Sequence, residues 1–251
     1  MPSPTFLPPT VAPEQLLSHL RQQGFAVMGA GSVAQWLGPT VARGLHDLGA
    51  FWNDLPADQY LKDGGRYRRR RHGSFVLNGQ DVQAVPHRAH WQPLSYNALH
   101  GGMERWFDPL QPELANHPSL QGLLLALGQC VSDLRGAQTW HVEVHAFRID
   151  TTDGIGRPTP EGAHRDGVDV VAVFMLGRHQ IKGGESRVFD AQGPSGQRFT
   201  LTEPWSLLLV DDQRVIHETT PIQPVDPDRE GWRDTLVVTL RAGGFLEEKK
   251  A

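Results

Sequence analysis

The feature that most constrains the fold of this chain is a series of short β-like runs between Trp140 and Leu240. Each run is rich in β-branched, aromatic or leucine residues, and turn-forming residues such as Gly, Pro and Asp separate the runs. In chain order they are WHVEVHAFRI, VDVVAVFML, ESRVFD, QRFT, WSLLLV, RVIHETT and DTLVVTL. Short strands in series with turn signals between them are typical of an antiparallel sandwich or barrel. The sequence therefore predicts a β-rich C-terminal half.

The N-terminal half has a different pattern. Leucine and valine repeat at helical spacing over 13–24, 40–52 and 119–134, and FAVM at 25–28 predicts a short strand. An irregular stretch rich in Arg, His, Gly, Pro and Trp fills 53–117. We expect one α+β, mainly β domain over 1–251, in which residues 1–139 give helical or irregular support to a β core at 140–242.

Composition excludes several classes of partner. The net charge is only -4 and the basic residues are spread along the chain, so no global field favours nucleic acid or an anionic membrane. The longest apolar runs fall far short of the roughly 20 residues that a membrane-spanning helix needs. We therefore expect a small-molecule substrate, no nucleic acid and no membrane, and we leave a homo-oligomer open. The single cysteine, Cys130, and a start without a secretory pattern predict a reducing, cytoplasmic location.

A candidate metal site lies just before the second of the β-like runs. His164 and Asp166 are two residues apart, so on an extended turn their side chains project to the same side, whereas Arg165 points away. His217, in RVIHETT, is a candidate third ligand from a distant strand. Two imidazoles and one carboxylate on one face form the triad of non-haem Fe(II) oxygenases. A lone H-x-D is more often a surface turn, and the chain has 12 histidines, so this prediction depends on its context.

That context is a resemblance to a known family. The segments EGAHRDGVDVVAVFML, GGESRVFD, VIHETTPI and WRDTLVVTL resemble successive motifs of the 2-oxoglutarate/Fe(II) dioxygenases, specifically the bacterial branch that includes free L-isoleucine hydroxylase. The resemblance covers about 140–242. It implies a double-stranded β-helix (a cupin-like jelly roll), Fe(II) bound by His164, Asp166 and His217, and 2-oxoglutarate as co-substrate. It also implies O2-dependent hydroxylation of a small, amino-acid-like substrate, with release of succinate and CO2.

An enzyme of this kind needs a buried cation for the far carboxylate of 2-oxoglutarate, and arginine binds a carboxylate through two donors. The candidates after His217 are Arg229, Arg233 and Arg241. Alternation along RDTLVVTL puts Arg233 and Thr235 on one face and the leucines on the other. This pair also matches the family's Arg-x-Ser/Thr pattern. Because Arg233 lies 16 residues beyond His217, a long interval, Arg229 stays a candidate.

Substrate-binding residues are harder to select. Glu161, three residues before His164, is a candidate for binding a substrate ammonium, or it only accepts backbone N–H groups in its turn. Arg148 is a candidate for binding a substrate carboxylate, although an ion pair on the sheet surface is the commoner role. The basic run RYRRRRHGSF favours a solvated strand or loop edge over an anion-binding wall. The histidines at 87, 90 and 100 match no zinc spacing and are expected to be loop or interface residues.

Two other functions fit the same residues. A barrel of this shape that holds another divalent metal could act as an isomerase or lyase without 2-oxoglutarate, and oxygen-dependent succinate formation separates that reading from a dioxygenase. A non-catalytic regulatory or stress-response protein that kept the fold is the third reading. The joint presence of His164, Asp166, His217 and a suitable arginine weighs against it, because folding alone does not require all four.

Overall fold

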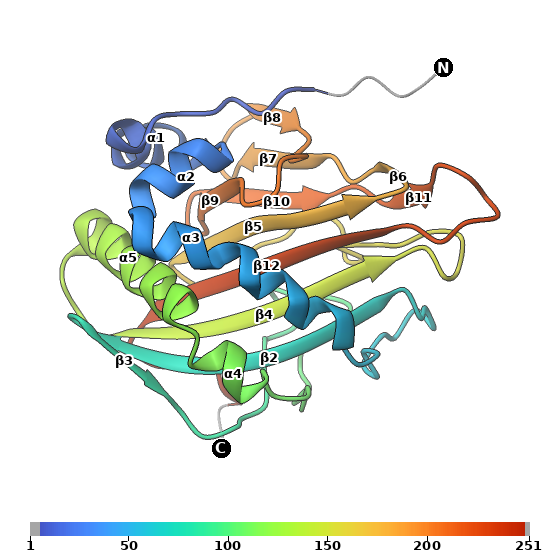
Figure 1. Ribbon diagram of the computed structural model, residues 1–251, viewed down its shortest axis with the longest axis horizontal. Coiled ribbons are helices and arrows are strands. Elements are labelled where there is room, and N and C mark those ends of the chain that lie inside the picture. Colours follow the sequence, from blue (N-terminus) through green and yellow to red (C-terminus); the bar gives the residue numbers. More distant parts are fainter. Residues whose placement is uncertain (1–5, 249–251) are drawn as a thin grey trace.

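The computed structural model describes residues 6–248. Its centre is a seven-stranded antiparallel sheet in the order β1-β9-β5-β12-β4-β2-β3 (Figure 1). The strands are β1 (Phe25–Met28), β2 (Arg68–Asn78), β3 (Asp81–Ala84), β4 (Trp140–Asp150), β5 (Val170–His179), β9 (Leu207–Asp211) and β12 (Trp232–Ala242). A three-stranded sheet, β10-β7-β8, and a two-stranded sheet, β11-β6, complete the jelly roll. They comprise β6 (Ile181–Gly183), β7 (Ser186–Asp190), β8 (Gly196–Phe199), β10 (Val215–Thr219) and β11 (Ile222–Pro224).

Helices cover one face of the large sheet (Figure 1). They are α1 (Leu16–Gln23), α2 (Ala30–Leu37), α3 (Pro39–Leu48), α4 (Pro112–Ala115) and α5 (Pro118–Arg135), with 3-10 turns η1 (Pro13–Gln15) and η2 (Gly49–Asp54). The main core lies between these helices and the sheet, and it contains Leu236, Val238 and Leu240 of β12. The intervening residues of β12 face the opposite side, toward the smaller sheet, because successive side chains of a strand alternate between faces. The prediction that Arg233 and Thr235 lie on one face of this strand and the leucines on the other is confirmed.

The seven predicted β-like runs are all strands, and FAVM is β1. The expectation that residues 1–139 supply only helical or irregular support is wrong for β2 and β3, which extend the large sheet beyond β4. The basic run that we expected at a solvated edge forms most of β2. Its arginines pair with β4, whereas β3 pairs only with the end of β2, from Phe75 to Asn78. The sequence did not predict β2 as a strand, because Arg, His and Ser occupy the positions where a buried strand face normally carries apolar residues.

Within residues 6–248, each helix is too short or too polar to cross a bilayer.

Candidate metal centre and its cavity

Two segments far apart in the chain build the candidate metal centre. His164 lies in the loop before β5 and His217 lies on β10, and their backbones form an antiparallel bridge with two N–H···O=C hydrogen bonds of 3.0 Å. Asp166 follows His164 by two residues. The Nε2 atom of His164 lies 3.8 Å from Oδ1 of Asp166, and Nε2 of His217 lies 3.6 Å from Oδ2. One donor atom from each residue lies within 4.8 Å of the other two, so the three can share one ion.

The two imidazoles are prepared for metal binding. Nδ1 of His164 lies 3.0 Å from the carbonyl oxygen of Gly162, and a proton donated there leaves the lone pair of Nε2 free for a metal. Burial, followed by the effect of neighbouring His164, lowers the pKa of His217 to about 3. The His217 imidazole is therefore neutral, as a metal ligand must be.

A buried carboxylate holds the turn that carries Asp166. The side chain of Asp212 accepts hydrogen bonds from three successive backbone N–H groups, those of Asp166 (2.9 Å), Gly167 (2.8 Å) and Val168 (3.1 Å). Gly167 has a left-handed conformation (φ +81°), and a Cβ there would lie 2.5 Å from the ring of Tyr96. This turn therefore needs both the carboxylate of Asp212 and a glycine after Asp166.

The triad lies on the wall of a cavity that encloses about 960 Å³ of empty space, its open mouth included. The inner faces of β2, β4 and β12 form the opposite wall in rows of paired residues. One row is Arg70, Phe147 and Thr235; the next is His72, His145 and Val237; a third is Ser74, Glu143 and Thr239. The helix-facing side of the same strands carries most of their apolar core residues, among them Phe75, Val144 and Leu236.

Arg233 and Thr235, the predicted pair for 2-oxoglutarate, both line this cavity. The Arg233 side chain is only 3% exposed, and among residues 6–248 no side chain or carbonyl accepts a hydrogen bond from its guanidinium. Burial, with Arg178 as the next cause, lowers the pKa of Arg233 to about 9. A buried cation without an anion is costly, so the position suits an anionic ligand. The competing candidate, Arg229, is 73% exposed and lies 3.6 Å from Asp226, outside the cavity.

Glu161 also lines the cavity. Its Oε1 atom lies 3.6 Å from Nε2 of His164, while Oε2 is buried without a hydrogen-bond partner among the described residues. No backbone N–H group in residues 6–248 donates to this carboxylate. The alternative in which Glu161 only caps its own turn therefore has no hydrogen bond to support it.

The structure does not bring Arg148 to the cavity. It lies on the opposite face of β4, where Nε and Nη2 donate to the two carboxylate oxygens of Asp234 at 2.8 and 2.7 Å. Its guanidinium also lies 4.6 Å from the ring centroid of Trp232. Arg148 thus occupies the ion pair that we considered its commoner role, and a substrate in the cavity would not meet it.

The sequence did not lead us to place Arg68, Arg70 and Arg105 at the cavity, although all three line it. Arg68 and Arg70 are 6% and 4% exposed and line the cavity, so the expectation of a solvated edge is wrong for both. The signal was available in the alternation of Arg68, Arg70, His72 and Ser74, all buried. Two further buried residues, His90 and Arg105, come from the irregular stretch and pair through their backbones. No periodicity marks such a loop, so neither could be placed from sequence.

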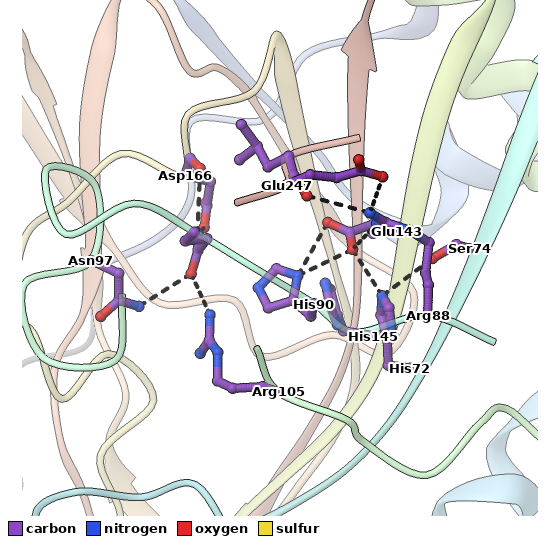
Figure 2. A network of polar contacts seen from close by, with 12 residues as sticks. His72, Ser74, Arg88, His90, Asn97, Arg105, Glu143, His145, Asp166 and Glu247 are labelled. Atoms are coloured by element: carbon purple, nitrogen blue, oxygen red, sulfur yellow. Dashed lines mark hydrogen bonds and ion pairs between the residues drawn. The ribbon is translucent and has the colours of Figure 1, made fainter. Parts of the chain in front are cut away.

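A second group of metal-type side chains lies along this wall, made of His72, His90, Glu143 and His145. Figure 2 shows the carboxylate of Glu143 in contact with His72, His90 and Arg88. The His72 Nε2 and His90 Nδ1 atoms both lie 3.1 Å from this carboxylate, and Arg88 Nη1 lies 3.5 Å away. This cluster was not predicted, because its members come from β2, β4 and the loop between β3 and α4.

Comparisons with known proteins agree with this geometry. A family model described as 2OG-Fe dioxygenase matches residues 49–239. The crystal structure of a bsmA homologue from Methylobium petroleophilum PM1 is 50% identical, has a TM-score of 0.89, and is matched over 96% of this chain and 97% of that one. A search of curated proteins finds no significant match.

Two more distant structures share the fold. The structure described as IDO from Bacillus thuringiensis is 17% identical, with a TM-score of 0.72 over 92% of this chain and 96% of that one. The Fe(II)/(alpha)ketoglutarate-dependent dioxygenase TqaL is 22% identical, with a TM-score of 0.71 over 91% and 86% of the two chains. At these identities the likeness concerns the fold alone.

Proposed function

Because this chain belongs to the 2OG-Fe dioxygenase family, whose members use Fe(II) and 2-oxoglutarate, we propose that it hydroxylates a small, amino-acid-like substrate in the cavity described above. In this proposal His164, Asp166 and His217 bind the iron. Arg233 and Thr235 bind the far carboxylate of 2-oxoglutarate. The co-products are succinate and CO2.

The observation that carries the proposal is the unpartnered guanidinium of Arg233 in the same cavity as the His164, Asp166 and His217 triad. The donor set of two imidazoles and a carboxylate fits Fe(II) with open coordination positions. The buried cation fits the second charge of a dicarboxylate. Bound iron, 2-oxoglutarate and O2 supply the oxidising chemistry, whereas the protein supplies position and a dry environment.

The residues of the chain have two further tasks in this proposal. Val168, Val171, Val173 and Val237 line the cavity and keep water from the reacting carbon. Glu161, whose Oε2 has no partner in the described structure, accepts a substrate ammonium. The motif resemblance to the bacterial free L-isoleucine hydroxylases supports a free or derivatised amino acid as the substrate.

The proposal is tested by adding 2-oxoglutarate to the anaerobic Fe(II) protein. We expect the weak visible metal-to-ligand absorption of a 2-oxoglutarate–iron chelate, and oxygen-dependent release of succinate when air is admitted. Both should be lost in His164→Ala, because one of three metal ligands is removed. His46→Ala is the matched control, since His46 lies on the surface with its side chain 98% exposed. Intact absorption in His164→Ala would contradict the iron assignment.

A further inference from the structure

One side chain from the irregular loop between β3 and α4 reaches the candidate metal ligand Asp166. The side chain of Gln92 is buried, and its Nε2 atom donates to Oδ1 of Asp166 at 3.1 Å. The same atom lies 3.4 Å from the carbonyl oxygen of Asp166. Among residues 6–248, no second side chain donates a hydrogen bond to this carboxylate. Asp212 holds the backbone of the turn, so Gln92 is the residue that acts on the carboxylate itself.

The partners of Gln92 fix which end of its amide faces Asp166. Oε1 of Gln92 accepts from Nη2 of Arg105 at 2.9 Å and from Nδ2 of Asn97 at 3.2 Å. A guanidinium only donates, so the amide oxygen must face Arg105. Asn97 is oriented in turn, because its Oδ1 accepts from the backbone N–H of His100 at 2.7 Å. The NH2 group of Gln92 is therefore left to donate to Asp166. Figure 2 shows Asn97 and Arg105 directed to one point beside Asp166.

The loop that carries Gln92 is also packed against the turn that carries Asp166. The carbonyl oxygen of Gln92 accepts from the backbone N–H of Gly102 at 2.8 Å, which closes the loop on itself. Tyr96, from the same loop, lies so close to Gly167 that a Cβ on this glycine would be 2.5 Å from the tyrosine ring. The amide of Gln92 is therefore held at a fixed place relative to the metal ligand.

Arg105 gives this amide a positive charge on its far side. Its guanidinium is buried and has no carboxylate within 4.0 Å among residues 6–248, and its Nε has no partner there. Burial, with Arg68 as the next cause, lowers the pKa of Arg105 to about 10, so the guanidinium stays charged at neutral pH. Hydrogen bonds in a chain polarise one another in a low-dielectric interior. The charge of Arg105 therefore strengthens the donor that Gln92 presents to Asp166.

We infer that Gln92 is a positioning residue of the metal centre, which holds the Asp166 carboxylate by Oδ1, leaves Oδ2 to the ion, and relays the charge of Arg105 to that carboxylate. The inference deepens the proposed function and rests on its assignment of Asp166 as a metal ligand. A carboxylate without this hydrogen bond is free to rotate and to offer both oxygens to the ion, which would take a coordination position that an oxygenase needs open.

The first experiment measures metal affinity with Co(II), whose visible absorption reports binding without O2 or 2-oxoglutarate. Gln92→Met removes the donor and keeps a side chain of similar length, and it should weaken Co(II) binding by about 10- to 100-fold. Gln129→Met is the matched control, because Gln129 donates to the Asp133 carboxylate at 2.8 Å on an exposed part of α5. This control should bind Co(II) as the parent protein does. Parental Co(II) affinity in Gln92→Met would overturn the inference.

A second measurement separates positioning from structural support, because Gln92→Met also takes an acceptor from Arg105 and Asn97. The Tm of the metal-free protein is measured beside the Co(II) affinity. Arg148→Met is the control for lowered stability, since it breaks an ion pair outside the cavity; it should lower Tm and keep Co(II) affinity. A lower Tm with parental Co(II) affinity in Gln92→Met would make Gln92 structural and refute the positioning role.

If Gln92→Met does not fold, Gln92→Asn takes its place. This variant keeps an amide, but its side chain is too short to reach Arg105 and Asp166 together, so Co(II) binding should weaken in the same range of about 10- to 100-fold. Parental affinity in Gln92→Asn would count against the inference in the same way.

The relay from Arg105 is tested in the anaerobic Fe(II)·2-oxoglutarate protein. Arg105→Met keeps Gln92 but removes the charge behind its amide. We expect the visible absorption to move to longer wavelength in Arg105→Met and further in Gln92→Met, because a carboxylate with a weaker donor gives more electron density to the iron. Arg66→Met, at an exposed arginine, is the control and should leave the absorption in place. A parental wavelength in both cavity variants would refute the relay.

The positioning role and the proposed function fail in different ways. If the parent protein forms the Fe(II)·2-oxoglutarate absorption but Gln92→Met binds Co(II) equally well, the positioning role is wrong and the dioxygenase chemistry stands. If Co(II) binds and Gln92→Met weakens it, but the parent protein forms no 2-oxoglutarate absorption, the metal centre and its positioning residue stand and the dioxygenase function fails.

Discussion

Arg233 and Arg148 stand on neighbouring strands, β12 and β4, and their surroundings give them opposite roles. Arg233 is buried in the cavity without an anion, whereas Arg148 donates to both oxygens of Asp234 on the helix-facing side. The alternation of each strand decides which arginine faces the cavity. The lack of a partner inside the protein is therefore the observation on which we propose Arg233 as a binding residue.

The unpartnered state of Arg233 leads to a prediction about ligand affinity and stability together. Arg233→Met should weaken 2-oxoglutarate binding by about 100-fold, because two charged hydrogen bonds to the carboxylate are lost. It should not lower the free energy of unfolding of the ligand-free protein, since it removes a buried charge. Titration of the visible absorption and urea unfolding measure the two quantities.

Arg229→Met is the control for Arg233→Met, because Arg229 is exposed and lies outside the cavity. It should change neither 2-oxoglutarate affinity nor stability. A weaker 2-oxoglutarate affinity in Arg229→Met, with Arg233→Met unaffected, would transfer the role to Arg229.

At the scale of elements, the two faces of β12 and β4 carry different kinds of residue: core residues on one face and cavity-lining polar residues on the other. The helix-facing side of both strands carries apolar core residues and the Arg148–Asp234 ion pair. The cavity side carries Arg233, Thr235, Glu143 and His145. Substitutions on the helix-facing side should therefore change the free energy of unfolding, and substitutions on the cavity side should change ligand binding.

For the helix-facing side we predict a stability effect without an activity effect. Arg148→Met should lower the free energy of unfolding by about 1 to 3 kcal/mol, because Asp234 is then left buried without its partner. The double variant Arg148→Met with Asp234→Leu should recover part of that loss. The KM for 2-oxoglutarate should stay unchanged in both variants. A raised KM in Arg148→Met would return Arg148 to the list of ligand-binding residues.

The strand β2 shows what limited prediction at this scale. Over its first seven residues the buried ones alternate: Arg68, Arg70, His72 and Ser74. Hydrophobic periodicity reports burial only where burial is apolar, and this face is buried against a polar cavity. Regular strands with apolar faces, such as β5 and β9, were predictable for the opposite reason.

At the scale of the molecule, the large sheet interleaves strands from both halves of the chain, since β1 pairs with β9 and β2 pairs with β4. We propose on this ground that residues 1–251 form one domain with a single unfolding transition. The buried polar wall should make that transition sensitive to acid. Burial lowers the pKa of His72, His90 and His145 below the ordinary 6.5, to about 4 for His90.

The sign of this effect follows from the depressed pKa values. A histidine that is neutral when folded takes up a proton more readily when unfolded, so its contribution is fully present above pH 6.5 and is lost as the pH falls toward the folded-state pKa. The metal-free protein should lose stability between pH 6.5 and 4. His90 alone accounts for about 3 kcal/mol of this loss.

Urea unfolding at several pH values measures this loss. His90→Gln should make the dependence on pH shallower, whereas His46→Ala, at an exposed position, should leave it unchanged. An identical slope in His90→Gln and the parent protein would mean that the histidine wall does not govern acid stability.

The sequence by itself determined the strands with apolar alternation, the helices that cover them, and the local H-x-D pair with its distant histidine, because each depends on residue type at short, regular spacing. Only the tertiary structure decided that Arg148 points away, that Arg233 rather than Arg229 faces the cavity, and that Arg70, His90, Arg105 and Glu143 meet around one space. With Arg233, the residues around this space come from β2, β4, β12 and the irregular loop between β3 and α4. Their proximity depends on strand pairing and loop path, and neither has a periodic signature in the chain.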